Sequence, residues 1–324
     1  MQRNQIMLIF CLAMLMYGCR KDKVHWQLVQ RIETGSGQDR FNRIFFLNDT
    51  VGFVVGGSRF DHSTILRTID GGQHWQMQHI VDAPKGLYGI CASPDGKLFA
   101  IGFDGKLLRS NNLGQSWELY QIAYLPYKDV CMLNAKQGLA IGGISFVTGF
   151  FTRFDSAGSY SAFDSLSYEL NDIEMVSENI GYMAGNSTIF RTNNGGQNWI
   201  PQVVKNDDFT AIHAYPDGNV WTCGYSGSIW NSSDFGLNWH CVRNGNNFLL
   251  PRYRLLDIVF FSSQVGFAVG ENGTFITTDD GGLHWMEMDK FTSEALRSIY
   301  LTKQGDLFVC GDSGGLFRIK PKLF

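Results

Sequence analysis

A hydrophobic strand that ends in glycine recurs seven times along this chain of 324 residues. Neighbouring copies are 39 to 46 residues apart, and the glycines are Gly56, Gly102, Gly142, Gly185, Gly224, Gly270 and Gly311. This period is that of one four-stranded blade in a β-propeller. The repeat therefore predicts an all-β fold, a seven-bladed β-propeller with four-stranded blades.

The composition agrees with many short strands joined by tight turns. Glycine occurs 37 times and proline seven times, and 14% of the residues are aromatic. A hydrophobic content of 44% is enough for a core and excludes a disordered chain. The net charge of −3 argues against a nucleic-acid partner, because proteins that bind nucleic acids normally carry a basic surface.

A second signature, S/T-x-D/N-x-G-x-x-W, occurs five times, at residues 68–75, 110–117, 192–199, 232–239 and 278–285. It predicts a tight hairpin between the third and fourth strands of a blade. The Asp or Asn accepts backbone N–H groups, the glycine takes a positive φ, and the tryptophan packs on the sheet. These side chains are Asp70 and Trp75, Asn112 and Trp117, Asn194 and Trp199, Asp234 and Trp239, and Asp280 and Trp285.

These turns could instead serve catalysis or bind calcium. Two of the five acidic positions hold asparagine, which is a poor acid or base but still closes a turn. We therefore expect a structural role and predict no metal site. The third repeat is degenerate, since residues 154–160 resemble the signature with one extra residue and a tyrosine in place of the tryptophan.

The first strands of the seven repeats also align, with an aliphatic residue at the second position of each. Glu174 and His213 occupy the third position in neighbouring repeats. They could form a polar pair near the axis of the ring. The simpler interpretation is a structural histidine whose hydrogen bonds are satisfied without Glu174.

The two ends of the chain predict how the ring closes. The last repeat ends at residues 315–319 without a fourth strand, while residues 25–29 (HWQLV) resemble the end of the first turn signature. We expect residues 25–30 to supply the outer strand of the last blade, so that no blade is left incomplete. Residues 25–324 would then form a single propeller.

The first residues are typical of an export signal. Arg3 precedes an apolar run at residues 6–17, which is too short to span a bilayer and ends in Gly18 and Cys19. Residues 1–18 thus resemble a lipoprotein signal peptide, with Cys19 as the lipidated residue and residues 19–24 as a short tether. An ordinary cleaved signal or an apolar anchor is the alternative. The lipoprotein interpretation predicts a location in the cell envelope, on the outer membrane and facing the periplasm or the outside.

The remaining cysteines of the mature chain are Cys91, Cys131, Cys223, Cys241 and Cys310. Their spacing matches neither C-x-x-C nor a zinc site. Cys223 and Cys310 each precede a strand glycine, where other repeats have small or branched apolar residues. We expect buried packing rather than a disulfide framework, and no cofactor.

The predicted topology places two unusual loops on the face opposite the turn signatures. Residues 58–62 and 242–256 combine arginine with exposed aromatic or aliphatic groups, a mixture enriched at interaction hot spots. A loop that only packs its own apolar groups is an equally good explanation. We expect a mixed aromatic and basic rim rather than a deep acidic cleft. The candidate partner-binding residues are Arg59, Asp61, Tyr127, Lys128, Phe248, Arg252, Tyr253, Arg254 and Arg297.

The sixth repeat, from Leu256 to Trp285, is similar to the repeat of the photosystem II stability/assembly factor family. Its turn signature resembles the Asp-box, or BNR repeat. The resemblance extends over essentially the whole predicted propeller and implies a seven-bladed fold of this size. Family members from photosynthetic organisms chaperone a reaction-centre protein through a basic patch, which cannot be matched here residue by residue. The photosynthetic role is therefore not carried over.

Two functions of different class are consistent with these features. The first is a non-catalytic binding or assembly scaffold, a monomer that holds a protein or peptide partner on the propeller's top face and contacts the membrane only through its lipid. The second is a glycan-binding protein or a carbohydrate-active enzyme of the sialidase type, which also carries Asp-boxes. Sialidases resembling the known ones have six blades and an early F/Y-R-I-P motif, whereas residues 42–45 read Asn-Arg-Ile-Phe. We therefore favour the scaffold and predict no enzymatic activity.

Overall fold

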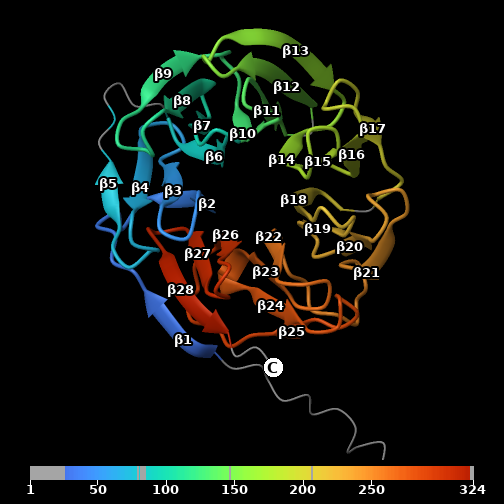
Figure 1. The fold of residues 1–324 in the computed structure, drawn as a ribbon. Coiled ribbons are helices and arrows are strands. Elements are labelled where there is room, and N and C mark those ends of the chain that lie inside the picture. The colour runs from blue at the N-terminus through green and yellow to red at the C-terminus, as the bar shows by residue number, and fades with distance from the viewer. Residues whose placement is uncertain (1–25, 79, 81–84, 146, 206, 322–324) are drawn as a thin grey trace, which may run out of the picture.

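The computed structural model describes residues 26–78, 80, 85–145, 147–205 and 207–321. These residues form seven antiparallel sheets of four strands each, arranged around a central axis (Figure 1). The predicted seven-bladed propeller is therefore confirmed. Within the described ranges there is one short 3₁₀ segment, η1 (Glu271–Gly273), and no helix has the length and hydropathy needed to span a bilayer.

Each blade contains consecutive strands in chain order, except the last. Blade 1 comprises β2 (Arg40–Phe46), β3 (Gly52–Gly57), β4 (Ser63–Thr68) and β5 (Gln76–Gln78). Blade 2 comprises β6 (Leu87–Ala92), β7 (Leu98–Gly102), β8 (Lys106–Ser110) and β9 (Glu118–Gln121). Blade 3 comprises β10 (Tyr127–Met132), β11 (Gln137–Ile144), β12 (Thr148–Asp155) and β13 (Tyr160–Leu166).

Blade 4 comprises β14 (Leu170–Met175), β15 (Gly181–Gly185), β16 (Thr188–Thr192) and β17 (Ile200–Pro201). Blade 5 comprises β18 (Phe209–Ala214), β19 (Val220–Gly224), β20 (Ile229–Ser232) and β21 (His240–Arg243). Blade 6 comprises β22 (Leu255–Phe260), β23 (Gly266–Gly270), β24 (Phe275–Thr278) and β25 (Met286–Glu287). Blade 7 comprises β26 (Leu296–Leu301), β27 (Leu307–Gly311), β28 (Leu316–Pro321) and, outermost, β1 (Trp26–Arg31).

The strand β1 from the start of the chain completes the last blade. It pairs antiparallel with β28, and Val29 lies opposite Ile319 (Figure 1). The predicted closure of the ring by an N-terminal strand is confirmed from Trp26 onward, whereas His25 lies outside the described residues. This pairing joins two segments almost 300 residues apart. Blade 7 thereby has four strands, like each of the other blades.

The hydrophobic core lies between blades rather than within one sheet. Seven clusters of buried apolar side chains are found among the described residues, and each joins two neighbouring blades. Both faces of each blade are therefore covered. This explains why second strands such as β23 are buried throughout and read as continuous apolar runs.

Five of the seven repeated strand glycines mark a close approach of two backbone segments: Gly56, Gly142, Gly185, Gly270 and Gly311. A Cβ atom on Gly56 would lie 2.0 Å from the carbonyl oxygen of Arg40, and one on Gly270 would lie 2.0 Å from that of Arg254. In both blades the glycine pairs with the start of the first strand, opposite Phe41 or Leu255, and lies against the carbonyl of the preceding residue. Only a residue without a side chain fits there, which gives the period in the sequence a steric cause.

The five turns with the second signature, called box turns below, have the same hydrogen bonds. In blade 1, Asp70 Oδ1 accepts the N–H of His74 at 3.0 Å, and Thr68 Oγ1 accepts the N–H of Gly72 at 3.0 Å. Burial by itself would raise the pKa of Asp70, but the hydrogen bonds from His74 and Thr68 lower it to about 2. Equivalent bonds are made by Ser110 and Asn112, Thr192 and Asn194, Ser232 and Asp234, and Thr278 and Asp280.

The box turns also connect neighbouring blades. Trp117 of blade 2 packs edge-on against Phe53 of blade 1, with ring centroids 6.1 Å apart. In the opposite direction, an arginine from the third strand of one blade donates to a carbonyl in the turn of the next. The donors and acceptors are Arg67 to Leu113, Arg109 to Ser156, Arg153 to Gly196 and Arg191 to Phe235.

The degenerate third repeat also closes through its acidic side chain. Asp155 Oδ1 accepts the N–H groups of Ala157 at 2.9 Å and Ser159 at 2.8 Å, while Tyr160 is exposed. The five described cysteines have free thiols. Cys131, Cys223 and Cys310 are buried, Cys91 is half-buried and Cys241 is exposed.

Candidate functional site

A β-bulge recurs in the innermost strand of every blade. In β2, for example, the pairing register shifts between Phe41 and Arg43, so that one extra residue is inserted. Such a bulge re-aims side chains, and here the extra residue of each strand lines a cavity of about 480 Å³ at one end of the channel. The seven extra residues are Asn42, Tyr88, Lys128, Asn171, Thr210, Leu256 and Arg297.

The cavity lined by the bulges, called the upper cavity, marks the top face of the propeller, and the box turns lie on the bottom face. Several bulge residues also connect blades. Asn42 Nδ2 donates to the carbonyl of Leu87 at 2.7 Å, and Thr210 Oγ1 donates to that of Leu255 at 2.9 Å. The upper cavity thus has a rim of polar side chains that are held in place by the next blade.

The residue after each bulge faces the axis one layer deeper. Where this residue is Asp or Ser, its side chain accepts an N–H from the innermost strand of the next blade, which is an edge with unpaired backbone groups. The bonds run from Ile173 to Asp129 at 3.2 Å, from Ile212 to Asp172 at 2.8 Å, from Ile299 to Asp257 at 2.9 Å and from Ile44 to Ser298 at 3.4 Å.

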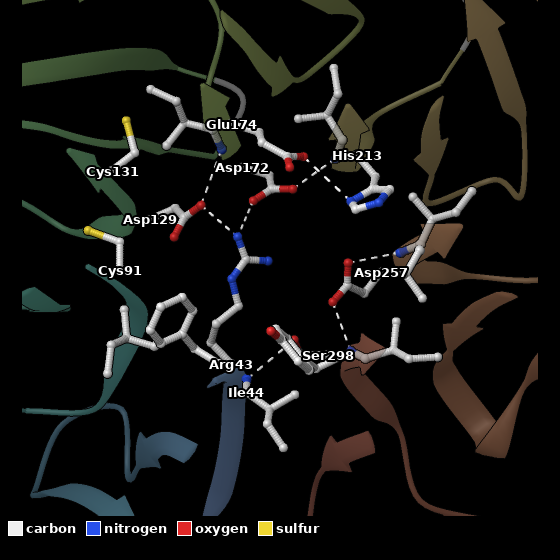
Figure 2. A pocket seen from close by; sticks show the side chains of 18 of the residues that line it. Arg43, Ile44, Cys91, Asp129, Cys131, Asp172, Glu174, His213, Asp257 and Ser298 are labelled. Carbon is white, nitrogen blue, oxygen red and sulfur yellow. Dashed lines mark hydrogen bonds and ion pairs between the residues drawn. The ribbon is translucent and has the colours of Figure 1, made fainter. Parts of the chain in front are cut away.

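Arg43 crosses the channel within this layer. Its guanidinium group forms an ion pair with Asp129 at 2.7 Å and another with Asp172, so that it joins blade 1 to blades 3 and 4 (Figure 2). The intervening blade 2 contributes Gly89, where a Cβ atom would lie 2.5 Å from Asp129 Oδ1. Glycine at this position therefore leaves the space in which Asp129 lies.

The two carboxylates of the Arg43 cluster have opposite pKa shifts. Burial raises the pKa of Asp129 well above its usual value despite the nearby Arg43, because the negative charge of Asp172 adds to the effect. For Asp172, the effect of burial is outweighed by Arg43 and by hydrogen bonds from Asp129 and Ile212, which lower the pKa. Arg43 thus favours the ionised form of Asp172, whereas Asp129 favours the protonated form.

Glu174 and His213 lie next to the Arg43 cluster and form a pair. His213 Nδ1 is 3.6 Å from Glu174 Oε2, which also accepts the N–H of Ala214 at 2.9 Å (Figure 2). Burial and the charge of Asp172 raise the pKa of Glu174 to about 8, and burial lowers the pKa of His213 to about 4. The favoured interpretation of a histidine satisfied on its own was wrong, because His213 lies beside Glu174 and its Nε2 has no hydrogen-bond partner among the described residues. The pair holds a proton near neutral pH.

A second cavity of about 530 Å³, called the lower cavity, occupies the channel on the bottom side of Arg43. Arg43 and Asp129 line both cavities. The expectation of a rim without an acidic cleft was wrong for the channel, because Asp129, Asp172, Glu174 and Asp257 all line the lower cavity. Ring closure brings these side chains together from three blades.

Two of the predicted partner-binding residues lie at the upper cavity. Lys128 Nζ forms an ion pair with Glu169 at 2.5 Å and donates to Asn171, and Arg297 forms an ion pair with Asp312 at 2.5 Å. Tyr127 was placed wrongly: its side chain is fully buried and its hydroxyl is hydrogen-bonded to Thr152. The bulge explains the difference, because Tyr127 remains paired in the sheet while Lys128 becomes the extra residue.

Arg59 and Asp61 are exposed on the loop between β3 and β4. The Arg59 guanidinium lies 4.5 Å from the ring centroid of Phe103, and Asp61 accepts a hydrogen bond from Ser58 at 2.6 Å. Arg59 and Phe103 line a third hollow of about 210 Å³, which shares Tyr88, Lys128 and Ser145 with the upper cavity. The two hollows therefore form one continuous depression on the top face.

The long loop after β21 projects from the same face. Phe248 is 88% exposed, and Arg252 is also exposed. Tyr253 is half-buried beneath the Arg243 guanidinium and donates to Glu287 at 3.2 Å, while Arg254 forms an ion pair with Glu271 at 3.2 Å. Arg254 also donates to Tyr225, which lines the upper cavity, so the base of the loop adjoins the depression.

Sequence reasoning missed the charged layer of the channel. Its signal was present, since Asp129, Asp172 and Asp257 begin equivalent segments of three first strands. Carboxylates that recur at the start of an apolar strand are exceptions to the hydrophobic pattern. They mark the positions that face the axis.

No protein-family model matches the chain. It is 24% identical over 299 residues to the photosystem II assembly lipoprotein Ycf48 of Synechococcus sp. (strain CC9902), covering 85% of this chain and 83% of that protein. It is also 24% identical over 296 residues to the chloroplastic photosystem II stability/assembly factor HCF136 of Arabidopsis thaliana, covering 86% of this chain and 63% of that protein.

Similar solved structures are also propellers. YCF48 bound to a D1 peptide superposes with a TM-score of 0.70 at 18% identity, over 93% of this chain and 99% of that one. YCF48 from Cyanidioschyzon merolae superposes with a TM-score of 0.68 at 17% identity, over 90% of this chain and 98% of that one. The WD40 repeats of RRP9 superpose with a TM-score of 0.72 at only 9% identity, over 93% of this chain and 99% of that one. Structural likeness at this level therefore reflects the fold alone. The chain is therefore a seven-bladed β-propeller that resembles the photosystem II stability/assembly factors in sequence and in fold.

Proposed function

We propose that this protein is a non-catalytic binding and assembly scaffold that holds a protein or peptide partner in the depression on its top face. The supporting observation is the continuity of the upper cavity with the hollow beside Arg59, through Tyr88, Lys128 and Ser145. Arginine and aromatic side chains at the centre of a concave surface are typical of binding hot spots. Such a surface suits an extended segment of a partner better than a small molecule.

The chemistry of the depression favours a segment that carries carboxylate groups. Arg59 is exposed and stacks on Phe103, so that its outward N–H groups remain available to an acceptor. Lys85 lies 6.0 Å from the ring of Phe60 on the same side. The D1 peptide in the similar YCF48 structure supports a peptide as the class of partner.

We also propose that Cys19 carries the lipid and that the protein is anchored in the cell envelope. Cys19 lies outside the described residues, but β1 begins at Trp26 opposite Pro321, at the end of β28 that faces the box turns. A tether of a few residues would therefore leave from the bottom face. With that face toward the bilayer, the depression on the top face points away from the membrane and stays open to a partner.

Fluorescence anisotropy with labelled peptides tests the binding site. The D1 peptide and a panel of acidic peptides serve as probes. Arg59→Glu is expected to lower the affinity for the peptide that binds by about tenfold or more. Lys136→Glu is the matched control, because Lys136 is exposed on the β10–β11 turn of the bottom face. Equal weakening by both variants, or none by Arg59→Glu, would place the site elsewhere.

A companion pair, Arg252→Glu and Arg254→Glu, tests whether the long loop takes part. For the anchor, Cys19→Ser is expected to move the protein from the membrane fraction to the supernatant. Continued membrane association of this variant would mean that another segment holds the protein there.

The glycosidase alternative has less support. The structure has seven blades, whereas the sialidase pattern has six, and the curated relatives above are assembly factors. A screen of fluorogenic sialosides and other glycosides tests this function. Hydrolysis of any of these glycosides by the purified protein would overturn the scaffold proposal.

A further inference from the structure

The lower cavity is a second concave site, on the other side of Arg43 from the depression on the top face. Its volume of about 530 Å³ lies in the range of small-molecule sites, about 300–1,000 Å³. Part of its wall is apolar and includes Phe45, Ala92, Met175 and Leu301. The side chains of His213 and Glu174 are 22% and 32% exposed within it, so solvent reaches the polar end.

The polar end has more carboxylates than cations. Arg43 is committed to Asp129 and Asp172 on one side of the channel. On the other side, Asp257 accepts backbone N–H groups from Ile258 at 2.8 Å and Ile299 at 2.9 Å (Figure 2). Among the described residues no lysine, arginine or histidine lies within 4 Å of its carboxylate. For Glu174, the titratable partner within 4 Å in the described part of the chain is the imidazole of His213.

His213 does not add a third accessible group. Its Nε2 atom is buried and has no hydrogen-bond partner among the described residues, so it is out of reach of a ligand in the cavity. Asp257 and Glu174 therefore present carboxylate acceptors to the same cavity, and the complementary ligand is a cationic donor.

We infer that the lower cavity binds an alkylammonium group, with the ammonium held by Asp257 and Glu174 and the alkyl chain lying along Phe45, Met175 and Leu301. An ammonium has three donors, which two carboxylates can accept. The apolar wall suits the methylene chain that carries it. In the described part of the chain, no three His, Cys, Asp or Glu side chains are arranged to hold a metal ion, which favours an organic cation.

Binding is linked to a proton. The raised pKa of Glu174, about 8, means that this carboxyl is mostly protonated at pH 7. An ammonium beside it favours the ionised form, so a proton is released to solvent when the ligand binds. Asp257, with a pKa raised to about 6 by burial despite Arg43, is already mostly ionised at that pH. Asp129, Asp172, Arg43 and His213 also face this space, and Arg43 keeps its charge throughout.

Isothermal titration calorimetry of the full chain with 1,6-diaminohexane tests the inference. We expect saturable binding of one diamine per chain, with proton release detected in two buffers of different ionisation enthalpy. The neutral analogue 1,6-hexanediol is expected not to bind. Diamine binding that never saturates, or equal binding of the diol, would overturn the inference.

Two variants test the assigned side chains. Glu174→Gln keeps an oxygen that can accept the N–H of Ala214, and Asp257→Asn keeps one oxygen for the two N–H groups that the Asp257 carboxylate accepts. Together the two changes are expected to weaken diamine binding by about tenfold or more. Arg59→Glu on the top face is the matched control and should leave it unchanged, which separates this site from the proposed peptide site. An unchanged diamine affinity in the folded double variant contradicts the assignment.

A measurement on the wild-type chain needs no variant. The diamine affinity is expected to rise between about pH 5 and about pH 8, as Asp257 and Glu174 ionise. A flat profile over this range would overturn the inference even if the variants failed to fold. Comparing a lysine peptide with its norleucine analogue then identifies the source, since selective binding of the lysine peptide points to a partner's side chain rather than a free amine.

Discussion

Arg43 of blade 1 and Asp172 of blade 4, 129 residues apart in the chain, form an ion pair within the axial channel. The pair spans positions that no single blade could bring together. It therefore reports on closure of the whole ring, and it sets the charge of both cavities that Arg43 separates.

Replacing Arg43 with methionine should strongly destabilise the propeller. Asp129 and Asp172 would be left buried and close together without their cation, and removing one partner of a buried pair costs about 3–5 kcal/mol. Urea unfolding measures the change in the free energy of unfolding. Arg252→Met, at an exposed site, should stay within about 0.5 kcal/mol. Similar values for the two variants would contradict the role assigned to Arg43.

Gly89→Ala should be destabilising although only a methyl group is added. The new Cβ atom would lie 2.5 Å from Asp129 Oδ1 and would displace that carboxylate from Arg43. Overpacking of this kind costs about 1–3 kcal/mol. Gly37→Ala is the control, because a Cβ atom there has nothing within 4 Å. Thermal melts that rank the two variants equally would rule out the steric explanation.

The pKa of Glu174 predicts a pH-dependent contribution to stability. Its pKa rises from 4.5 to about 8 on folding, so the folded state binds the proton more tightly. The stabilisation is complete below the unfolded pKa and is lost as the pH rises through the folded one. Relative to Glu174→Gln, the wild-type chain should lose about 2–3 kcal/mol between about pH 5 and about pH 8, since each pKa unit is worth about 1.4 kcal/mol and channel water screens part of it. Parallel stability profiles for the two proteins would refute this.

Trp239→Ala should weaken the contact between blades 4 and 5. The indole packs against the cluster that contains Tyr182 and donates to the carbonyl of Gly236 at 3.1 Å. Because the ring is half-buried, the expected loss is about 3 kcal/mol, at the low end for tryptophan deletions. Differential scanning calorimetry measures it, and an unchanged midpoint would show that the box-turn tryptophan does not stabilise the interface.

Deleting residues 26–31 should expose one edge of blade 7. β28 would lose its partner, so the amides of residues 316–320 should exchange faster with deuterium. The amides of β15 in blade 4, on the far side of the ring, provide the internal reference. Full protection of β28 in the deletion variant would mean that β1 contributes little to closure.

The sequence by itself determined the number of blades, their boundaries and the way the ring closes. These features depend on local events: Gly56 permits one close backbone approach, Asp70 closes one hairpin, the strand glycine recurs every 39 to 46 residues, and the hairpin signature recurs five times. The N-terminal strand could be recognised because residues 25–29 resemble residues 74–77.

Only the tertiary structure decided what the channel contains. Arg43, Asp129, Asp172 and Asp257 belong to four different repeats, and nothing in their spacing says which of them will touch. The β-bulge in each innermost strand then decides which of two neighbouring side chains faces the axis, which is why Lys128 lines the upper cavity and Tyr127 is buried. A repeat fixes each blade through contacts inside it, whereas the site is formed by contacts between blades, and these exist only when the ring is closed.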